Sequence, residues 1–120
     1  MSKNDDEAIR RVEELIEAMR NLRELLGRRE EMLRRALQVS EPAPDFTVAL
    51  KDAQITEQRE DLNEALFTLE RCRRESRIAS FRTALDHGVS INELGRIWGF
   101  SRQMASRYAK EARGESPEQP

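Results

Sequence analysis

The chain has little of what metal centres, disulfide frameworks and membrane anchors require. It contains one cysteine and one histidine among 120 residues, so no internal disulfide can form and a structural zinc site lacks ligands. No apolar run approaches the roughly 20 residues of a membrane span, and the first residues, MSKNDDEA, lack the basic-then-apolar order of a signal peptide. We therefore expect a cytoplasmic protein with no metal, no other cofactor and no membrane partner.

Aromatic residues are also scarce, at 5% of the chain, whereas charged residues make up 37%. The apolar material is therefore thin and mostly aliphatic, which favours an all-α fold that obtains part of its core from partner helices. No catalytic triad or carboxylate pair can be identified in the sequence. We expect a helical, oligomeric protein that is not an enzyme.

The net charge of −2 conceals a division along the chain. Residues 71–114 contain 10 basic and 4 acidic residues, a net +6, whereas residues 41–70 contain 2 and 8, a net −6. Residues 1–40 balance at 9 and 9, and residues 115–120 add 2 acidic residues. A basic segment of this size attracts nucleic-acid phosphates, so residues 71–114 are the expected DNA-binding part.

Residues 5–38 are predicted to form one long helix, because apolar residues recur at 3-4 spacing without a proline. Written as heptads, the seam is interrupted by two charged residues, Arg23 and Glu30. Further leucines, among them Leu22 and Leu25, widen the apolar stripe on its flank. A helix packed in a small bundle is therefore favoured over a two-stranded coiled coil.

The length of this helix indicates that it binds a partner. It spans roughly 50 Å at 1.5 Å per residue, more than a three-helix domain can cover. We therefore favour residues 1–39 as a dimerisation arm over the alternative, packing against the second helix of the same chain. The predicted dimerisation residues are Ile9, Val12, Ile16, Met19, Leu22, Leu26, Leu33 and Leu37.

Residues 40–56 are predicted to be a proline-containing linker and an irregular segment. SEPAPD, at 40–45, holds two prolines that cannot continue a helix. FTVALKDAQIT, at 46–56, is ambiguous between strand, loop and poor helix, and we expect a loop that can include short helical turns.

A second arm helix is predicted over 57–76, with a leucine stripe that ends at Leu69. The next apolar stripe begins at Ile78, nine residues later, and at 100° per residue it lies on the opposite side. We therefore place the start of the next domain at residue 77. The helix either breaks near residues 73–77 or continues and serves two cores.

Local signals from Ser90 onward indicate two short helices joined by a tight turn. Ser90 and Glu93 form an S-x-x-E capping box. Gly95 stands in mid-helix, where it costs roughly 1 kcal/mol relative to alanine unless another helix approaches closely. Gly99 supplies a left-handed stop, and Ser101 caps the next helix, predicted at 101–113.

One run at the turn is similar to a known sequence motif: Gly99-Phe100-Ser101-Arg102-Gln103-Met104-Ala105-Ser106-Arg107. It resembles the G-[hydrophobic]-S-R-Q-x-[V/A]-S-R run that opens the recognition helix of many bacterial helix-turn-helix regulators. Gly95 stands where alanine is commoner, and Ala105 where valine or isoleucine is more usual. The resemblance covers residues 78–112, about a third of the chain, and implies a DNA-binding domain without naming a particular regulator.

The register of these helices assigns expected roles. A helix-turn-helix domain at 77–113 would be followed by a disordered tail at 114–120. Arginine and glutamine are the side chains that pair bidentately with guanine and adenine, so base contacts are expected from Arg102, Gln103 and Ser106. Phosphate contacts are expected from Ser90, Asn92, Ser101, Arg107 and Lys110. The expected domain core is Phe81, Leu85, Leu94, Ile97, Trp98, Phe100 and Tyr108.

Three functions are compatible with this sequence. The first is a homodimeric transcriptional regulator, a repressor, that reads an inverted repeat in double-stranded DNA and is associated with the nucleoid. The second is a DNA-binding architectural, segregation or packaging adaptor, of bacterial or phage type, whose helical arm recruits another protein. The third is a helical scaffold for protein interactions that never binds DNA.

Overall fold

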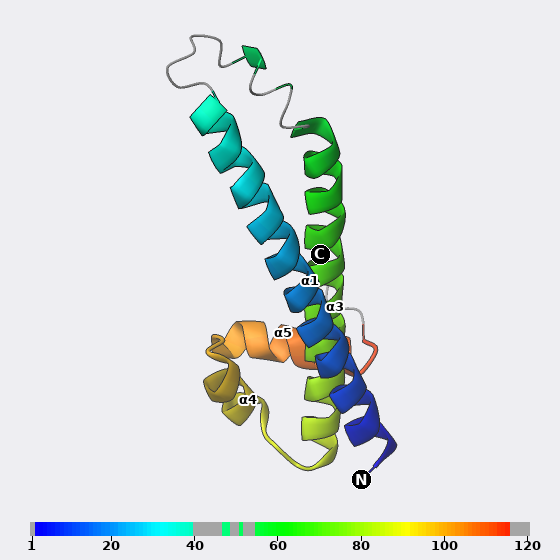
Figure 1. The fold of residues 1–120 in the computed structure, drawn as a ribbon. Helices are drawn as coiled ribbons and strands as arrows, with labels where there is room; N and C mark the ends of the chain where they lie inside the picture. Colours follow the sequence, from blue (N-terminus) through cyan, green and yellow to red (C-terminus); the bar gives the residue numbers. More distant parts are fainter. Residues whose placement is uncertain (1, 40–46, 49–50, 52–54, 116–120) are drawn as a thin grey trace. The chain divides into compact units, whose positions relative to one another are not determined.

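Helices account for the regular secondary structure of the residues that the structure describes. A computed structural model describes residues 2–39, 47–48, 51 and 55–115, which contain helices and no strand (Figure 1). The helices with defined bounds are α1 (Lys3–Val39), α3 (Ile55–Asp86), α4 (Ile91–Trp98) and α5 (Arg102–Ala112). None of the helices in this described part is long and apolar enough to cross a membrane. The all-α class expected from the sequence is confirmed.

The second long helix is continuous. It starts at Ile55, two residues before the predicted start, and runs without a break to Asp86. The sequence contains neither proline nor glycine over this range, so nothing in it forces a break near residues 73–77. In the predicted linker, Thr47, Val48 and Lys51 are helical. Residues 40–46, 49–50 and 52–54 of that linker, and 116–120 of the predicted tail, lie outside the described residues.

The chain divides into two compact units whose boundaries fall inside α1 and α3. One unit combines residues 1–15 with residues 71–120, and the other consists of residues 16–70. The predicted boundaries, after residues 39, 56 and 76, followed proline positions and the reversal of an apolar stripe. The packing groups the chain differently, because both long helices pass from one unit into the other.

In the unit of residues 16–70, α1 and α3 run antiparallel (Figure 1). Ala18 and Ala36 of α1 are buried, and Leu22 and Leu25 are half-buried at the same helical spacing. Both helices line one shared depression, formed by Ala18, Asn21, Leu25, Arg28, Asp61, Glu64, Ala65 and Thr68. The inward face of α1 is therefore not the predicted heptad seam but the stripe beside it. The two stripes are one residue apart in sequence, which is about 100° around the helix.

This packing places Leu22 on the inward face of α1 and leaves most of the other predicted dimerisation residues at the surface. Leu22 belongs to the inward face, because it follows Ala18 by four residues and precedes Leu25 by three. Leu33 is half-buried. Six predicted seam residues are between 39% and 57% exposed: Ile9, Val12, Ile16, Met19, Leu26 and Leu37.

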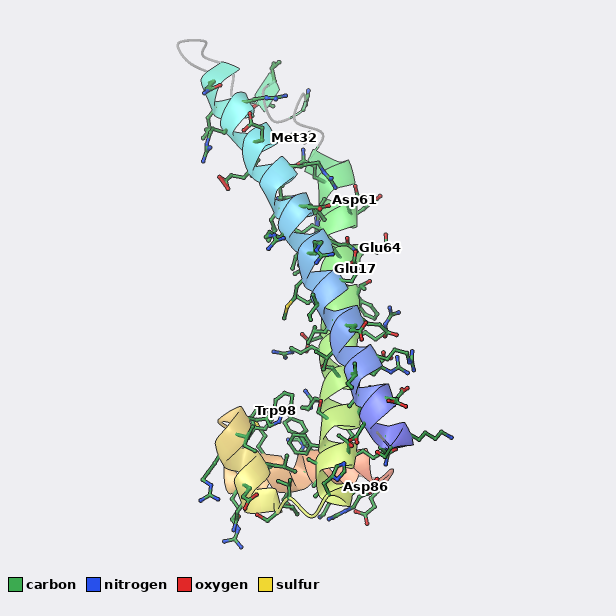
Figure 2. All side chains as sticks on the ribbon, turned by 60° about the horizontal axis from the view of Figure 1, so that its bottom comes forward. Glu17, Met32, Asp61, Glu64, Asp86 and Trp98 are labelled. Atoms are coloured by element: carbon green, nitrogen blue, oxygen red, sulfur yellow. The ribbon has the colours of Figure 1, made fainter. Side chains whose placement is uncertain are left out.

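The core of the other unit lies where α4 and α5 pack on the end of α3. Phe81 is fully buried, and Leu94, Ala109 and Ala112 are buried around it. Of the predicted core residues, Leu85, Phe100 and Tyr108 also pack against this cluster. Trp98 is 38% exposed, but its ring lies 5.7 Å from that of Phe81, on the side of α4 that faces α3 (Figure 2).

Ile97 was wrongly expected in this core. Its side chain is 71% exposed. The inward face of α4 passes through Ile91, Leu94 and Trp98, which share one side at 3-4 spacing. Ile97 follows Leu94 by three residues, but it lies about 100° from Trp98 and falls on the outer edge of this short helix.

In the unit of residues 1–15 and 71–120, polar contacts hold the first turn of α1 against the end of α3. The Thr83 hydroxyl donates a hydrogen bond to the Asp5 carboxylate, and His87 Nε2 lies 3.0 Å from the same oxygen. One and a half turns later, the Arg11 guanidinium donates to Glu75 at 2.8 Å. The bond from Thr83, followed by that from His87, holds the pKa of Asp5 well below its usual range.

Replacing this carboxylate tests these contacts. Asp5→Asn should lower the free energy of unfolding above about pH 4, where the unfolded carboxylate is charged. The contribution of a group whose pKa is lower in the folded state is fully present above its unfolded pKa and is lost progressively as the pH falls from there toward the folded pKa. In urea unfolding, the difference between wild type and variant should therefore be larger at pH 5 than at pH 3. An equal difference at both pH values would contradict this role for the Asp5 charge.

Candidate nucleic-acid interface

Local backbone geometry fixes the connection between α4 and α5. Ser90 caps α4 in an extended conformation, and its side chain accepts a hydrogen bond from the Glu93 N–H at 3.1 Å. Gly99 ends α4 in the left-handed conformation, with φ of 74°, which glycine adopts without steric cost. The Phe100 N–H then donates to the Gly95 carbonyl at 2.8 Å. The chain therefore reverses over Gly99, Phe100 and Ser101 before α5 begins.

The two helices meet most closely at Gly95. A Cβ atom added there would lie 3.2 Å from the Phe100 carbonyl oxygen and 3.4 Å from the Ala105 Cβ. Both Gly95 and Ala105 are buried. This close approach explains why a glycine stands in the middle of α4, where it would otherwise destabilise the helix. It also accounts for alanine at position 105, since a branched side chain would enter the same space.

The first turn of α5 presents polar side chains outward. Ser101 caps the helix by accepting a hydrogen bond from the Met104 N–H at 3.1 Å. Arg102, Gln103 and Arg107 are exposed, and Ser106 is half-buried. One open depression is lined by Ser101, Arg102, Gln103, Met104, Ser106, Arg107 and Lys110. We call these seven residues the α5 surface.

The α5 surface brings together six of the eight predicted site residues. They are the three expected base contacts and, of the expected phosphate contacts, Ser101, Arg107 and Lys110. Ser90 and Asn92 are exposed at the amino end of α4 and do not line this depression. Met104, which had no assigned role, is 39% exposed within the α5 surface.

The only acidic residue of α5 is held away from this surface. Glu111 accepts hydrogen bonds from Arg74 at 3.0 Å and from Arg77 at 3.4 Å, both on α3. Its side chain is only 19% exposed. The Arg77 guanidinium also lies over the Tyr108 ring, 3.9 Å from its centre, and makes a cation–π interaction with it. The α5 surface consequently keeps the positive charge of its two arginines and its lysine.

Sequence reasoning missed these inward contacts. Arg74, Arg77 and Arg82 were counted only as part of the basic segment, yet Arg82 Nε donates to the Ala112 carbonyl at 3.0 Å. This bond occupies one of the carbonyls that a helix end leaves without a partner. The position of Glu111, three residues after the inward-facing Tyr108, was the one available signal that it points toward α3.

The chemistry of the α5 surface suits recognition of an anion. Guanidinium, ammonium and amide groups donate hydrogen bonds to phosphate oxygens and to base edges. In the part of the chain that the structure describes, no group of His, Cys, Asp and Glu side chains is arranged to hold a metal ion. Comparison with protein-family models, curated proteins and solved structures gave no match to this chain.

Two glycine substitutions test the close approach of α4 and α5. Gly95→Val should lower the free energy of unfolding by about 1–3 kcal/mol, because the branched side chain must displace the Phe100 backbone or Ala105. Gly27→Ala provides the matched control. That glycine also lies within a helix, but an added Cβ meets nothing within 4 Å, so the change should stabilise the protein by about 0.5–1 kcal/mol. Urea unfolding measures both, and a Gly95→Val variant as stable as wild type would contradict the tight contact.

Proposed function

We propose that this protein binds double-stranded DNA in a sequence-specific manner, with α4 and α5 as a helix-turn-helix and α5 as its recognition helix. The observation that carries the proposal is the α5 surface: it holds two arginines, a lysine and a glutamine, while the one acid of the helix is paired with α3. A solvated helix without a binding role usually alternates the signs of its charges.

The amino-terminal turn of α5 is the part proposed to read bases. Recognition helices enter the major groove with their amino-terminal residues against base edges. Arg102 and Gln103 are the first two residues of α5 and are exposed, and Ser106 lies one turn after Arg102. An arginine pairs bidentately with guanine and a glutamine with adenine. These two side chains would therefore set the sequence preference.

The remaining contacts are proposed to position the protein on the phosphates. Arg107 and Lys110 extend the α5 surface away from its amino end. Ser101 and Ser90 each use a hydroxyl oxygen as an acceptor in a helix cap. Their hydroxyl protons can still be donated to a phosphate oxygen beside the positive end of the helix dipole. Asn92, exposed in the first turn of α4, would donate a hydrogen bond to a phosphate oxygen from its side-chain amide.

We further propose that the protein acts as a homodimeric transcriptional repressor. Two recognition helices related by a two-fold axis read half-sites about 34 Å apart, so the preferred DNA would be an inverted repeat. Within the unit of residues 16–70, the exposed apolar residues Ile16, Met19 and Leu26 of α1 supply a surface through which a dimer can form. A repressor of this kind acts by covering a promoter.

Three substitutions on the α5 surface test the assigned roles. Arg102→Ala and Gln103→Ala should each cost about 1–3 kcal/mol on a preferred duplex and little on random DNA, because they remove base contacts. Lys110→Ala should weaken binding to both duplexes alike and reduce the slope of log affinity against log salt by about 1, because it removes one phosphate contact. Fluorescence anisotropy with labelled duplexes at several salt concentrations measures all three.

Arg35→Ala is the matched control for these variants. It removes one exposed positive charge from α1, where Arg35 pairs only with Glu31 of its own helix at 3.3 Å among the contacts described. Its affinity for either duplex should equal that of wild type. Equal losses on preferred and random DNA for Arg102→Ala, Gln103→Ala and Lys110→Ala would overturn the division into base and phosphate contacts. Absence of binding to any duplex at low salt would overturn the proposed function itself.

A further inference from the structure

One side of α1 carries an apolar stripe that the described residues of this chain leave exposed. In the unit of residues 16–70, Ile16 is 50% exposed, Met19 51% and Leu26 45%. These residues follow the 3-4 spacing of a heptad seam, and Ile9 and Val12 occupy the preceding seam positions of the same helix. The inward face of α1, with Ala18 and Ala36, is already packed within the chain. The stripe is therefore a second apolar face, about 100° round the helix.

The neighbouring helix extends this face. Leu66 of α3 is 45% exposed and follows the inward-facing Ala65 by one residue. On α1, Met19 follows the buried Ala18 by one residue in the same way. One step along a right-handed helix turns the side-chain direction by about 100°. Because α1 and α3 run in opposite directions, this step turns Met19 and Leu66 toward the same side of the helix pair. The hairpin of α1 and α3 thus presents one apolar face formed by both helices.

Two charged residues interrupt the stripe and indicate what covers it. Arg23 and Glu30 occupy seam positions seven residues apart, and both are exposed. If two copies of α1 met in parallel and in register, Arg23 would face Arg23 and Glu30 would face Glu30 across the seam. Like charges that face each other across an interface are unfavourable. In an antiparallel pair, Arg23 of each copy can instead approach Glu30 of the other.

We propose that a second copy of this chain covers the stripe, with the two α1 helices antiparallel. In the register that keeps the most apolar contacts while bringing the charges together, Ile16 of one copy meets Leu33 of the other, and Arg23 lies beside Leu26. Arg23 and the opposing Glu30 are then four residues, or about 6 Å, apart along the axis. Glu30 already accepts a hydrogen bond from Arg34 at 2.8 Å, and its second oxygen can accept one from Arg23.

This surface would make a four-helix assembly of two hairpins. It specifies the partner, the face and the direction of the dimer that the proposed repressor uses. The proposed dimer does not require DNA, because only the exposed residues and charges of α1 and α3 would form it. Failure of the dimer experiments below leaves DNA binding by α5 open, and failure to bind DNA leaves the dimer open.

Disulfide trapping tests the direction of the two helices. In a Cys72→Ala background, Ile16→Cys is prepared without a tag and Leu33→Cys with an affinity tag that changes its mass. The two proteins are mixed under reducing conditions and then oxidised. The expected product is the mixed disulfide between positions 16 and 33. Homodimers joined through position 16 alone would overturn the antiparallel arrangement, and an absence of any cross-linked dimer would overturn the interface.

A charge exchange gives an independent test without cysteine. Sedimentation equilibrium of Arg23→Glu and of Glu30→Arg should show dimers at least about tenfold weaker than wild type, because each change places like charges across the antiparallel seam twice. The double variant Arg23→Glu/Glu30→Arg should recover most of this loss. Arg35→Glu, the same charge change elsewhere on α1, should leave the dimer unchanged. A wild-type chain that is monomeric at micromolar concentration, or single variants as strong as wild type, would overturn the proposal.

Discussion

The approach of α4 to α5 at Gly95 determines which side of α5 reaches the surface. A Cβ atom at that position would lie only 3.2 Å from the Phe100 carbonyl oxygen, so α4 and α5 can approach this closely only without a side chain there. Ala105, in contact with this point, is fully buried and fixes the inward side of α5. Arg102 and Gln103 consequently point outward. The polar surface therefore depends on the absence of a side chain at one buried position.

The basic residues near α5 divide into two groups, those that contact the protein itself and those that remain at the surface. Three arginines of α3 make contacts with α5: Arg74 and Arg77 pair with Glu111, and Arg82 binds the end of α5. Arg74 and Arg77 neutralise Glu111, the one acid of α5. The arginines and the lysine of α5 remain at the surface. The net +6 of residues 71–114 thus includes both structural cations and cations that a phosphate backbone can reach.

How far the sequence predicted the structure depended on the range of the interaction. Helix caps and turns are local, so Ser90, Gly99 and Ser101 could be placed from a few neighbouring residues. Ile97 could not, because in a helix of eight residues the apolar spacing fits either side until the position of α3 is known. The pairing of Glu111 with Arg74 joins residues 37 apart in the chain and needed the tertiary structure.

The first helix shows the same limit on a larger scale. Two heptad stripes run along α1 one residue apart, and the sequence favoured the richer one as an interface between chains. The other stripe, with smaller residues such as Ala18 and Ala36, packs on α3. Spacing alone cannot divide two adjacent stripes between intramolecular and intermolecular partners, since both satisfy the same period. The small side chains of one stripe were the signal that it makes the closer contact.

Selection of bound duplexes from a random pool would show whether α5 reads DNA sequence, as we propose. Wild-type protein and the Arg102→Ala/Gln103→Ala variant would be taken through the same rounds at the same salt concentration. We expect wild type to enrich one recurrent sequence arranged as an inverted repeat, and the variant to retain duplexes without that preference. Enrichment of the same sequence by both proteins, or no enrichment by wild type, would contradict it.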